Sequence, residues 1–231
     1  MVVQGSAVEY RYPRGARALR DVGFSWPDGF VALLGPNGAG KSTLLSLLVG
    51  ARRLQQGTID LGDQSSVGYV PQLADWPGRF TVSELLSYAG WWHGVPRSSR
   101  PERVAAALHA MDLLEVADDQ LSSLSGGYHR RAMIAQALVH EPAVLVLDEP
   151  SSGLDPRQRI HLRALLAQLA QDRTVVVATH LVEDVEAVAG WLSVIDAGRM
   201  VFDGSMDDVR QRWGKKDRGS ALESAYMSLV P

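Results

Sequence analysis

A glycine-rich run early in the chain carries its clearest chemistry. It follows the spacing G-x-x-x-x-G-K-[ST] of a phosphate-binding loop without deviation, and its members are Gly35, Pro36, Asn37, Gly38, Ala39, Gly40, Lys41, Ser42 and Thr43. Glycines allow the backbone to wrap closely around a polyphosphate and to present successive N–H groups to it. Lys41 adds a positive charge for the outer phosphates, and Ser42 offers a hydroxyl to Mg²⁺. The run predicts a site for a polyphosphate and its metal ion.

Both flanks of this loop suit the motif. The apolar run Phe30–Leu34 predicts a buried strand, and the apolar positions of Ser42–Val49 recur at helical spacing up to Gly50, a helix stop. A helix that begins near Lys41 adds the positive end of its dipole to the same anion. A simple glycine turn at the end of a strand is the alternative, but it would not require the whole pattern together with both flanks.

Two adjacent carboxylates follow a second apolar strand. Val144–Leu147 predicts a buried strand, and Asp148 and Glu149 come directly after it. At the strand tip Asp148 would hold Mg²⁺, directly or through water. Glu149, one residue nearer the substrate, could polarise an attacking water. Loops often begin with an acidic residue, so the pair indicates catalysis chiefly because the phosphate-binding loop lies in the same chain.

A second anion-binding loop is predicted at Leu124–Gly127. Ser125 can cap the helix that follows, while Gly126 and Gly127 leave its first N–H groups exposed. An ordinary capped helix start is the alternative, and it would be the better interpretation of this tetrapeptide by itself. Its place shortly before the strand that ends in Asp148 favours the functional interpretation.

The composition limits the class of protein. The chain has 231 residues, enough for one large α/β domain or for a core with a small inserted subdomain. Its 46% hydrophobic and 21% charged residues are typical of a soluble globular protein. The net charge of −3 argues against bulk nucleic-acid binding, and the absence of cysteine excludes disulfides and cysteine metal sites. The chain shows neither a signal-peptide pattern nor an apolar stretch that approaches the length of a membrane span, so we expect a cytoplasmic protein.

Strands and helices alternate along most of the chain. Predicted strands cover Val2–Tyr12, Leu19–Ser25, Phe30–Leu34, Gly57–Leu61, Val67–Val70, Ala143–Leu147, Thr174–Ala178, Leu192–Asp196 and Arg199–Asp203. Predicted helices cover Thr81–Trp92, Glu102–Leu114, Gly126–Val139 and Pro156–Ala170. Alternation around a phosphate-binding loop predicts an α/β fold with a mostly parallel sheet covered on both faces. The helical block at about 80–140 interrupts the alternation and is interpreted as an insertion.

Together these motifs resemble the nucleotide-binding subunit of an ABC transporter, over essentially all of residues 1–205. The family's phosphate-binding loop, its signature and its Walker B strand with the catalytic glutamate all have counterparts described above. Further matches are the glutamine loop Tyr69-Val70-Pro71-Gln72, the D-loop Ser152-Gly153-Leu154-Asp155 and the switch histidine of Thr179-His180. The resemblance implies a P-loop NTPase core with an N-terminal antiparallel β-subdomain and an inserted α-helical subdomain.

The resemblance also implies roles for individual residues. ATP and Mg²⁺ are the implied cofactors; Glu149 would polarise the attacking water and His180 would brace the γ-phosphate. The implied metal ligands are Ser42, Gln72 and Asp148. The implied ATP contacts are Tyr12, which would stack on adenine, residues 35–43, Ser125, Gly126, Gly127 and Asp155. Plainer interpretations are a strand-packing Tyr12 (with Tyr10 as the alternative aromatic), a solvated Gln72 and a surface His180. Tyr128 departs from the family, which usually has glutamine there.

The implied partners follow from the same family. Two copies, or one copy and a related ATPase subunit, would sandwich two ATP molecules, and a separate integral membrane permease would make the protein peripheral on the inner face of the membrane. The segment Leu222–Val230 resembles the short closing helix of bacterial exporter ATPases, which favours export. The alternative is a soluble ABC ATPase that acts on ribosomes or DNA, but such proteins usually have tandem domains, a coiled-coil insert or a basic surface.

Four further predictions concern the periphery. The ATPase domain is expected at 1–205, followed by a short helical tail at 206–231, with 203–220 as a surface helix and linker. Gln72 is expected to relay the nucleotide state to a membrane subunit that docks around Leu73–Arg79 and Trp91–His93. We expect one of Trp91 and Trp92 to pack in the core. The pair Arg130-Arg131 is expected on a solvated face.

Overall fold

The computed structural model describes residues 2–13, 15–62, 66–73, 76–214 and 220–230. Within these residues the central sheet has six strands in the order β5-β6-β7-β3-β8-β9. The strands are β3 (Phe30–Leu34), β5 (Val67–Val70), β6 (Val144–Asp148), β7 (Thr174–Thr179), β8 (Trp191–Asp196) and β9 (Arg199–Ser205). Neighbouring strands run parallel except at the β8–β9 pair, which is antiparallel. The predicted α/β fold with a mostly parallel sheet is confirmed.

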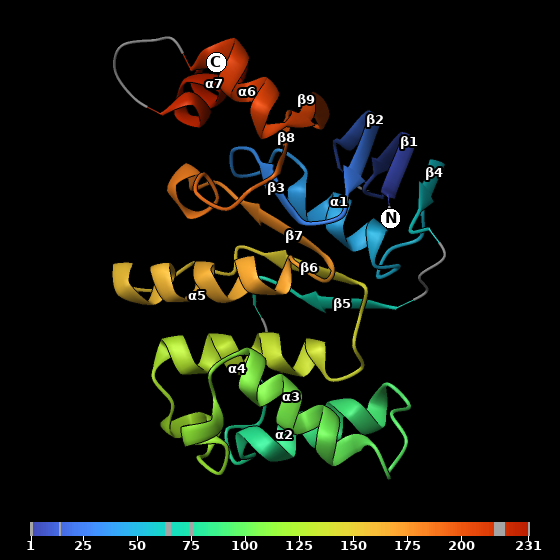
Figure 1. Ribbon diagram of the computed structural model, residues 1–231. Helices are drawn as coiled ribbons and strands as arrows, with labels where there is room; N and C mark the ends of the chain where they lie inside the picture. The colour runs from blue at the N-terminus through green and yellow to red at the C-terminus, as the bar shows by residue number, and fades with distance from the viewer. Residues whose placement is uncertain (1, 14, 63–65, 74–75, 215–219, 231) are drawn as a thin grey trace.

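A separate antiparallel sheet is formed by β1 (Val2–Arg11), β2 (Arg17–Pro27) and β4 (Gln56–Asp60), in the order β2-β1-β4. In Figure 1 it lies at the upper right, beside the central sheet. A buried bond, donated by Trp26 Nε1 to Ser193 Oγ at 2.7 Å, ties β2 to β8. The antiparallel sheet is therefore attached to the central sheet by specific polar contacts as well as by packing.

The central strands are buried on both faces, which explains their unbroken apolar sequences. Along β3, Phe30, Ala32 and Leu34 pack into one hydrophobic cluster, while Val31 and Leu33 pack into another. Successive side chains of a strand point to opposite faces of the sheet, so both faces of β3 must be covered. The helices α1 (Lys41–Leu48) and α5 (Pro156–Leu169) belong to this layered core.

A helical block contains α2 (Val82–Trp92), α3 (Arg100–Ala110) and α4 (Gly126–Leu138), with short 3₁₀ turns η1 (Leu114–Val116) and η2 (Leu121–Ser123). It occupies the bottom of Figure 1, across β5 and β6 from the antiparallel sheet. The predicted capping box at its entrance is present: Thr81 Oγ1 accepts from the Glu84 backbone, and the Glu84 carboxylate accepts from Thr81 N. Near the other end of the chain, α6 (Met206–Trp213) and α7 (Ala221–Leu229) pack together.

Three local predictions are wrong. Helix α3 ends at Ala110 and not at Leu114, because Asp112 takes a left-handed backbone with φ of 53° and the chain restarts as η1. Neither tryptophan at the end of α2 is in the core: Trp91 is 57% exposed and Trp92 is 69% exposed. Arg131 is buried, with 8% exposure, because it donates to backbone carbonyls of Met111 and Asp112.

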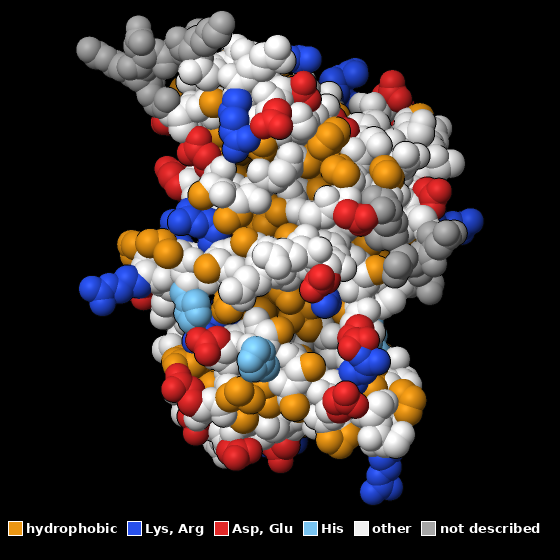
Figure 2. All heavy atoms as spheres, in the orientation of Figure 1, with side chains coloured by type: hydrophobic (Ala, Val, Ile, Leu, Met, Phe, Trp, Pro, Cys, Tyr) orange, Lys and Arg blue, Asp and Glu red, His pale blue; other side chains and the backbone are white. Residues whose placement is uncertain are grey.

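Two further observations bear on the predicted tail and on membrane insertion. Helix α7 covers most of the predicted closing segment, whereas residues 215–219 of the predicted linker and residue 231 lie outside the described residues. Within the described ranges, none of the helices has the length and hydropathy needed to cross a bilayer. Figure 2 shows acidic and basic side chains interspersed over the face drawn.

Candidate functional site

A cavity of about 460 Å³ opens beside the phosphate-binding loop. Its lining includes ten of the residues predicted from sequence to contact the nucleotide or metal: Tyr12, Pro36, Asn37, Gly38, Gly40, Lys41, Ser42, Thr43, Gln72 and Glu149, to which the structure adds Ala18. The loop joins β3 to α1, whose N-cap is Gly40 in a left-handed conformation with φ of 112°. A Cβ on Gly40 would lie 2.8 Å from the Ala18 carbonyl oxygen, so both conformation and space require glycine here.

Lys41 is buried at the base of this cavity. Its Nζ donates to the carbonyl oxygens of Gly35, at 2.7 Å, and Pro36, at 3.3 Å, and lies 3.5 Å from Glu149 Oε1. A buried ammonium needs anionic or carbonyl partners, and here the loop's own backbone supplies them. Because Lys41 also lines the cavity, its ammonium group is placed to meet an anion there.

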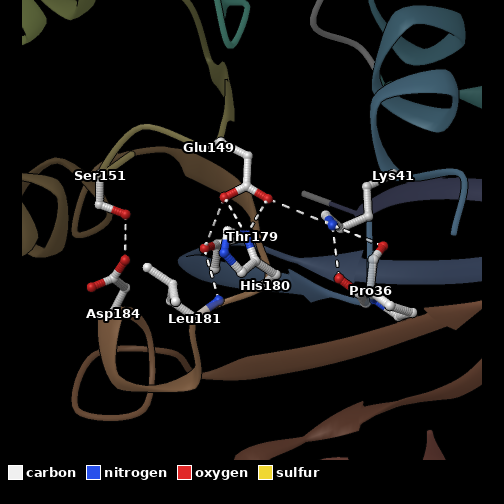
Figure 3. A network of polar contacts seen from close by, with 9 residues as sticks. Pro36, Lys41, Glu149, Ser151, Thr179, His180, Leu181 and Asp184 are labelled. Atoms are coloured by element: carbon white, nitrogen blue, oxygen red, sulfur yellow. Dashed lines mark hydrogen bonds and ion pairs between the residues drawn. The ribbon is translucent and has the colours of Figure 1, made fainter. Parts of the chain in front are cut away.

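Glu149 lies at the centre of a polar network (Figure 3). Thr179 Oγ1 donates to its Oε2 at 3.3 Å, and His180 Nδ1 lies 3.0 Å from Oε1. A carboxylate can only accept, so in this contact the imidazole proton resides on Nδ1. The arrangement arises because β6 and β7 are parallel neighbours, with Asp148 opposite Ala178, so the residues after each strand meet at one edge of the sheet.

Asp148 offers a ligand set that fits Mg²⁺. The side chain is 3% exposed, and within the described part of the chain its Oδ1 has no hydrogen-bond partner. The pKa of this carboxyl is raised, chiefly by burial. The hydrogen bond from Ser42 and the Lys41 charge oppose the rise, and the nearby Glu149 charge adds to it. A buried carboxylate oxygen without a partner, beside a serine hydroxyl, is a hard-oxygen donor set of the kind that Mg²⁺ prefers.

Tyr12 lines the cavity next to the first turn of α1. Its hydroxyl lies 3.0 Å from Thr43 Oγ1, and its ring meets that of Tyr10 edge-on with centres 5.1 Å apart. The guanidinium carbon of Arg52 lies 5.0 Å from the centre of the Tyr12 ring. Tyr12 lines the cavity whereas Tyr10 lines a separate groove with Arg52, so of the two tyrosines Tyr12 is the one placed to meet a base.

The second glycine loop is separate from this cavity. Ser125 is the N-cap residue of α4, but its side chain makes no capping hydrogen bond, contrary to the prediction. A Cβ on Gly127 would lie 2.7 Å from the side-chain amide of Gln158, whereas a Cβ on Gly126 would meet nothing within 4 Å. The small cavity next to this loop measures about 110 Å³, which is too small for a nucleotide.

The predicted site residues therefore divide into groups. Gly35 and Ala39 are buried within the phosphate-binding loop, and Asp148 and His180 lie behind or beside the cavity without lining it. Ser125 and Gly127 line the small cavity at the start of α4. Asp155 caps α5, since its Oδ1 accepts from Gln158 N at 3.0 Å. Within one chain, the two glycine loops do not meet.

Four contributors to this site are not predicted from the sequence. Thr179 precedes the predicted switch histidine, and its hydroxyl donates to Glu149. Arg130 of α4 donates to the Gln72 carbonyl oxygen at 3.3 Å and so connects the helical block to the glutamine loop. Ser151 donates to Asp184 in η3 (Val182–Asp184) beside the catalytic network. The signal available for Ser151 and Asp184 is that they lie two residues after Glu149 and four residues after His180, whereas nothing in the sequence indicates Arg130.

Comparison with known proteins agrees with this geometry. The family model described as ABC transporter matches residues 19–152. An uncharacterised ABC transporter ATP-binding protein of Bacillus subtilis (strain 168) is 35% identical over 79% of this chain and 63% of its own length. A Nod factor export ATP-binding protein I of Ralstonia nicotianae is 39% identical over 77% of this chain and 59% of its own length. The chain thus spans about 60% of the length of these two relatives.

Solved structures give the same result. A metal-chelate type ABC transporter in an inward-facing conformation superposes with a TM-score of 0.81 and 30% identity, over 90% of this chain and 84% of the other. An ATP-binding subunit of an ABC transporter superposes with a TM-score of 0.81 and 26% identity, over 99% of both chains. The chain belongs to the ABC transporter family and carries its ATP-binding domain.

Proposed function

We propose that the chain is the ATP-hydrolysing subunit that powers an ABC transporter through a separate membrane-spanning subunit. The observation that carries the proposal is the grouping of Lys41, Ser42 and Glu149 around one cavity, with Asp148 behind it and His180 beside it. A phosphate-binding lysine, metal-binding oxygens and a positioned carboxylate are the parts that phosphoryl transfer to water requires.

The residues divide the work of hydrolysis. The backbone N–H groups of the loop and Lys41 would hold the phosphates. Asp148 and Ser42 would hold Mg²⁺, with Gln72 as a further ligand, and the ion supplies charge neutralisation at the phosphates when bound. Glu149 would polarise the attacking water, and His180, which contacts the Glu149 carboxylate, would orient it and brace the γ-phosphate. Tyr12 would stack on the adenine.

We further propose that two copies enclose two ATP molecules. The phosphate-binding loop of one copy would face Ser125, Gly126 and Gly127 of the other. Support comes from the placement of the two loops at the start of α1 and α4, in different parts of the molecule (Figure 1), where they cannot clasp one phosphate chain. Asp155, in the segment between Glu149 and α5, would make a further contact to ATP.

The surface around the glutamine loop and the end of α2 is the proposed docking site for the membrane subunit. Leu73 is 91% exposed, and the rings of Trp76, Tyr88 and Trp91 contact one another in series. An open groove of about 570 Å³ lies alongside, lined by Arg79, Phe80, Ser83, Glu84 and Ser87. Exposed aromatic side chains next to a groove are typical of protein contact sites. Residues 74 and 75 of the predicted docking segment lie outside the described residues.

The direction of transport is proposed to be export. The relatives include Nod factor export proteins and a linearmycin resistance ATP-binding protein of Bacillus subtilis, which is 34% identical over 85% of this chain. The segment that forms α7 carries the exporter-like pattern noted in the sequence. The substrate would be set by the membrane subunit.

Hydrolysis and coupling can be tested in one preparation. Purified chain should release phosphate from ATP in the presence of Mg²⁺ and lose this activity with EDTA. Gln72→Ala should leave ATP binding nearly intact but reduce hydrolysis stimulated by the membrane subunit more than basal hydrolysis, because Gln72 lies between the cavity and the docking surface. Ser87→Ala, in the groove but away from the cavity, is the matched control for basal turnover. Absence of any Mg²⁺-dependent hydrolysis would refute the proposed function.

A further inference from the structure

We propose that Ser151 and Asp184 are positioning residues for Glu149 and His180, and that they act through the hydrogen bond between their side chains. The inference rests on the ATPase function proposed above and goes beyond it by adding two residues that touch neither the cavity nor the phosphate-binding loop. Ser151 Oγ donates to Asp184 Oδ2. Figure 3 shows this contact beside the Glu149 network, on the side away from Lys41.

The contact joins the two segments that carry the catalytic side chains. Glu149 and Ser151 follow β6, whereas His180 and Asp184 follow β7. Glu149 and His180 form an inner cross-link between these segments at 3.0 Å, and Ser151 and Asp184 form an outer one. Two cross-links fix the relative orientation of two segments, while a single one lets them pivot.

The backbone at Glu149 needs such support. Its φ of 47° lies in the left-handed region, which a residue with a Cβ adopts at an energetic cost and keeps only where its surroundings hold it there. Before the turn, Glu149 N donates to the Ala178 carbonyl oxygen at 2.8 Å. After the turn, the buried Ser151 hydroxyl is the side-chain anchor to the neighbouring segment.

The Asp184 side of the cross-link is itself held in place. Asp184 ends η3, and Arg163 of α5 donates to the carbonyl oxygen of the preceding Glu183 at 2.9 Å. The outer link therefore ties the turn after Glu149 to a segment anchored on α5.

The outer link matters most while Glu149 acts on water. The Glu149 carboxylate already contacts Lys41, Thr179 and His180. His180 Nδ1 lies within reach of both carboxylate oxygens, so each oxygen has two contacts and the roughly four acceptor positions are filled. The carboxylate must therefore exchange at least one contact to hold an attacking water. Ser151 and Asp184 are not part of that exchange, so their bond keeps the two segments in register when the inner contact loosens.

The test uses steady-state hydrolysis at saturating ATP, ATP affinity and thermal unfolding of purified variants. Ser151→Ala and Asp184→Ala should each lower kcat by about three- to tenfold, as expected for one lost positioning bond, with ATP affinity unchanged. The double variant should be no slower than either single variant, because both remove the same bond. Ser151→Thr, which keeps the hydroxyl, should recover most of the rate. Glu183→Ala, an exposed carboxylate next to Asp184, is the matched control and should behave as the wild type.

Any other outcome would overturn either this proposal or the ATPase function on which it rests. Unchanged kcat in Ser151→Ala, or losses that multiply in the double variant, would overturn the proposal, since the residues would then not act as a pair. Loss of ATP affinity in step with kcat, or failure of both alanine variants to fold, would assign the contact a purely structural role and overturn it as well. Wild-type chain without any hydrolysis would instead refute the proposed ATPase function.

Discussion

The two glycine loops use similar residues but have different surroundings. Gly35–Thr43 leads into α1 and lies in a cavity of about 460 Å³, with Lys41, Gln72 and Glu149 of the same chain on its walls. Ser125–Gly127 leads into α4, where Ser125 and Gly126 are exposed and the neighbouring cavity measures about 110 Å³. Both loops offer N–H groups at a helix N-terminus.

Whether such a loop forms a binding site depends on the side chains that face it. The first loop faces a lysine, oxygens of the kind that Mg²⁺ prefers and a carboxylate, all supplied by its own chain. The second loop has a backbone suited to phosphate. The side chains next to it contact other parts of the same chain: Arg131 donates to a backbone carbonyl at the end of α3, and Gln158 packs against Gly127. We therefore interpret the second loop as half of a site that a second copy completes.

The largest effect is expected when the chemistry of the first loop is removed. Glu149→Gln keeps the size and hydrogen bonding of the side chain but removes its basicity. Loss of a positioned base should lower kcat by roughly 10²–10⁴-fold while ATP still binds. Phosphate release and equilibrium ATP binding measure the two effects, and turnover at the wild-type rate would show that Glu149 is not the base.

A smaller effect is expected from the cation of the first loop. Lys41→Ala removes the ammonium group that we propose contacts the phosphates, and it should weaken ATP binding by about 10- to 100-fold, the typical range for a hydrogen bond to a charged group. Arg53→Ala, an exposed cation outside the cavity, changes the net charge equally and is the control. ATP titration that detects no difference between the two variants would contradict the assignment of Lys41.

A substitution in the second loop should affect dimerisation and turnover but not ATP binding by the isolated chain. Gly126→Ala meets no atom within 4 Å, so the fold and ATP binding by the isolated chain should be unaffected. It should nevertheless lower ATP-dependent dimerisation and turnover by about tenfold, because the methyl group blocks close approach of a phosphate held by the other copy. Sedimentation at matched MgATP concentrations measures the dimerisation. A loss of ATP affinity in the isolated monomer would contradict the prediction, because Gly126 would then contact the ATP bound by its own chain.

The smallest effect concerns the far end of α4. His140 stacks on His93 with ring centres 3.9 Å apart, and burial, with a further contribution from the His93 charge, lowers the pKa of His140 from 6.5 to about 4. The unfolded state then binds the proton more readily, so stability should fall as the pH drops from about 6.5 towards 4. His140→Gln should flatten this part of the thermal-unfolding profile, whereas the exposed His109→Gln should not. If the stability of the wild type, His140→Gln and His109→Gln fell in parallel as the pH dropped, the lowered pKa of His140 would be contradicted.

Local patterns predicted the fold well because each signal is carried by neighbouring residues. The strand before Gly35, the helix after it and the capping box at Thr81 are read within a few positions, and the structure contains all three. The roles of the site residues stay predictions, although most of the nucleotide-contact residues named from sequence line one cavity.

The end of α3 was missed for a local reason, the left-handed backbone of Asp112, whereas three other misses depend on how separate elements pack. Arg131 is buried because carbonyl groups at the end of α3 receive its guanidinium, and no local pattern reveals such partners. Trp91 and Trp92 are both exposed because α2 packs through Leu85, Leu86 and Ala89 instead. The bond between Ser151 and Asp184 requires β6 and β7 to be neighbours, which the sequence does not state.

The most direct test of the composite site is a cross-link between the two loops of different copies. The chain has no cysteine, so Asn37→Cys in one preparation and Ser125→Cys in another, both with Glu149→Gln to retain ATP, each carry a unique thiol. A short bismaleimide added to their mixture should give a species of twice the chain mass with MgATP, and little of it without nucleotide or with either variant alone. Equal linking without nucleotide, or none with MgATP bound, would contradict the claim that two copies share each site.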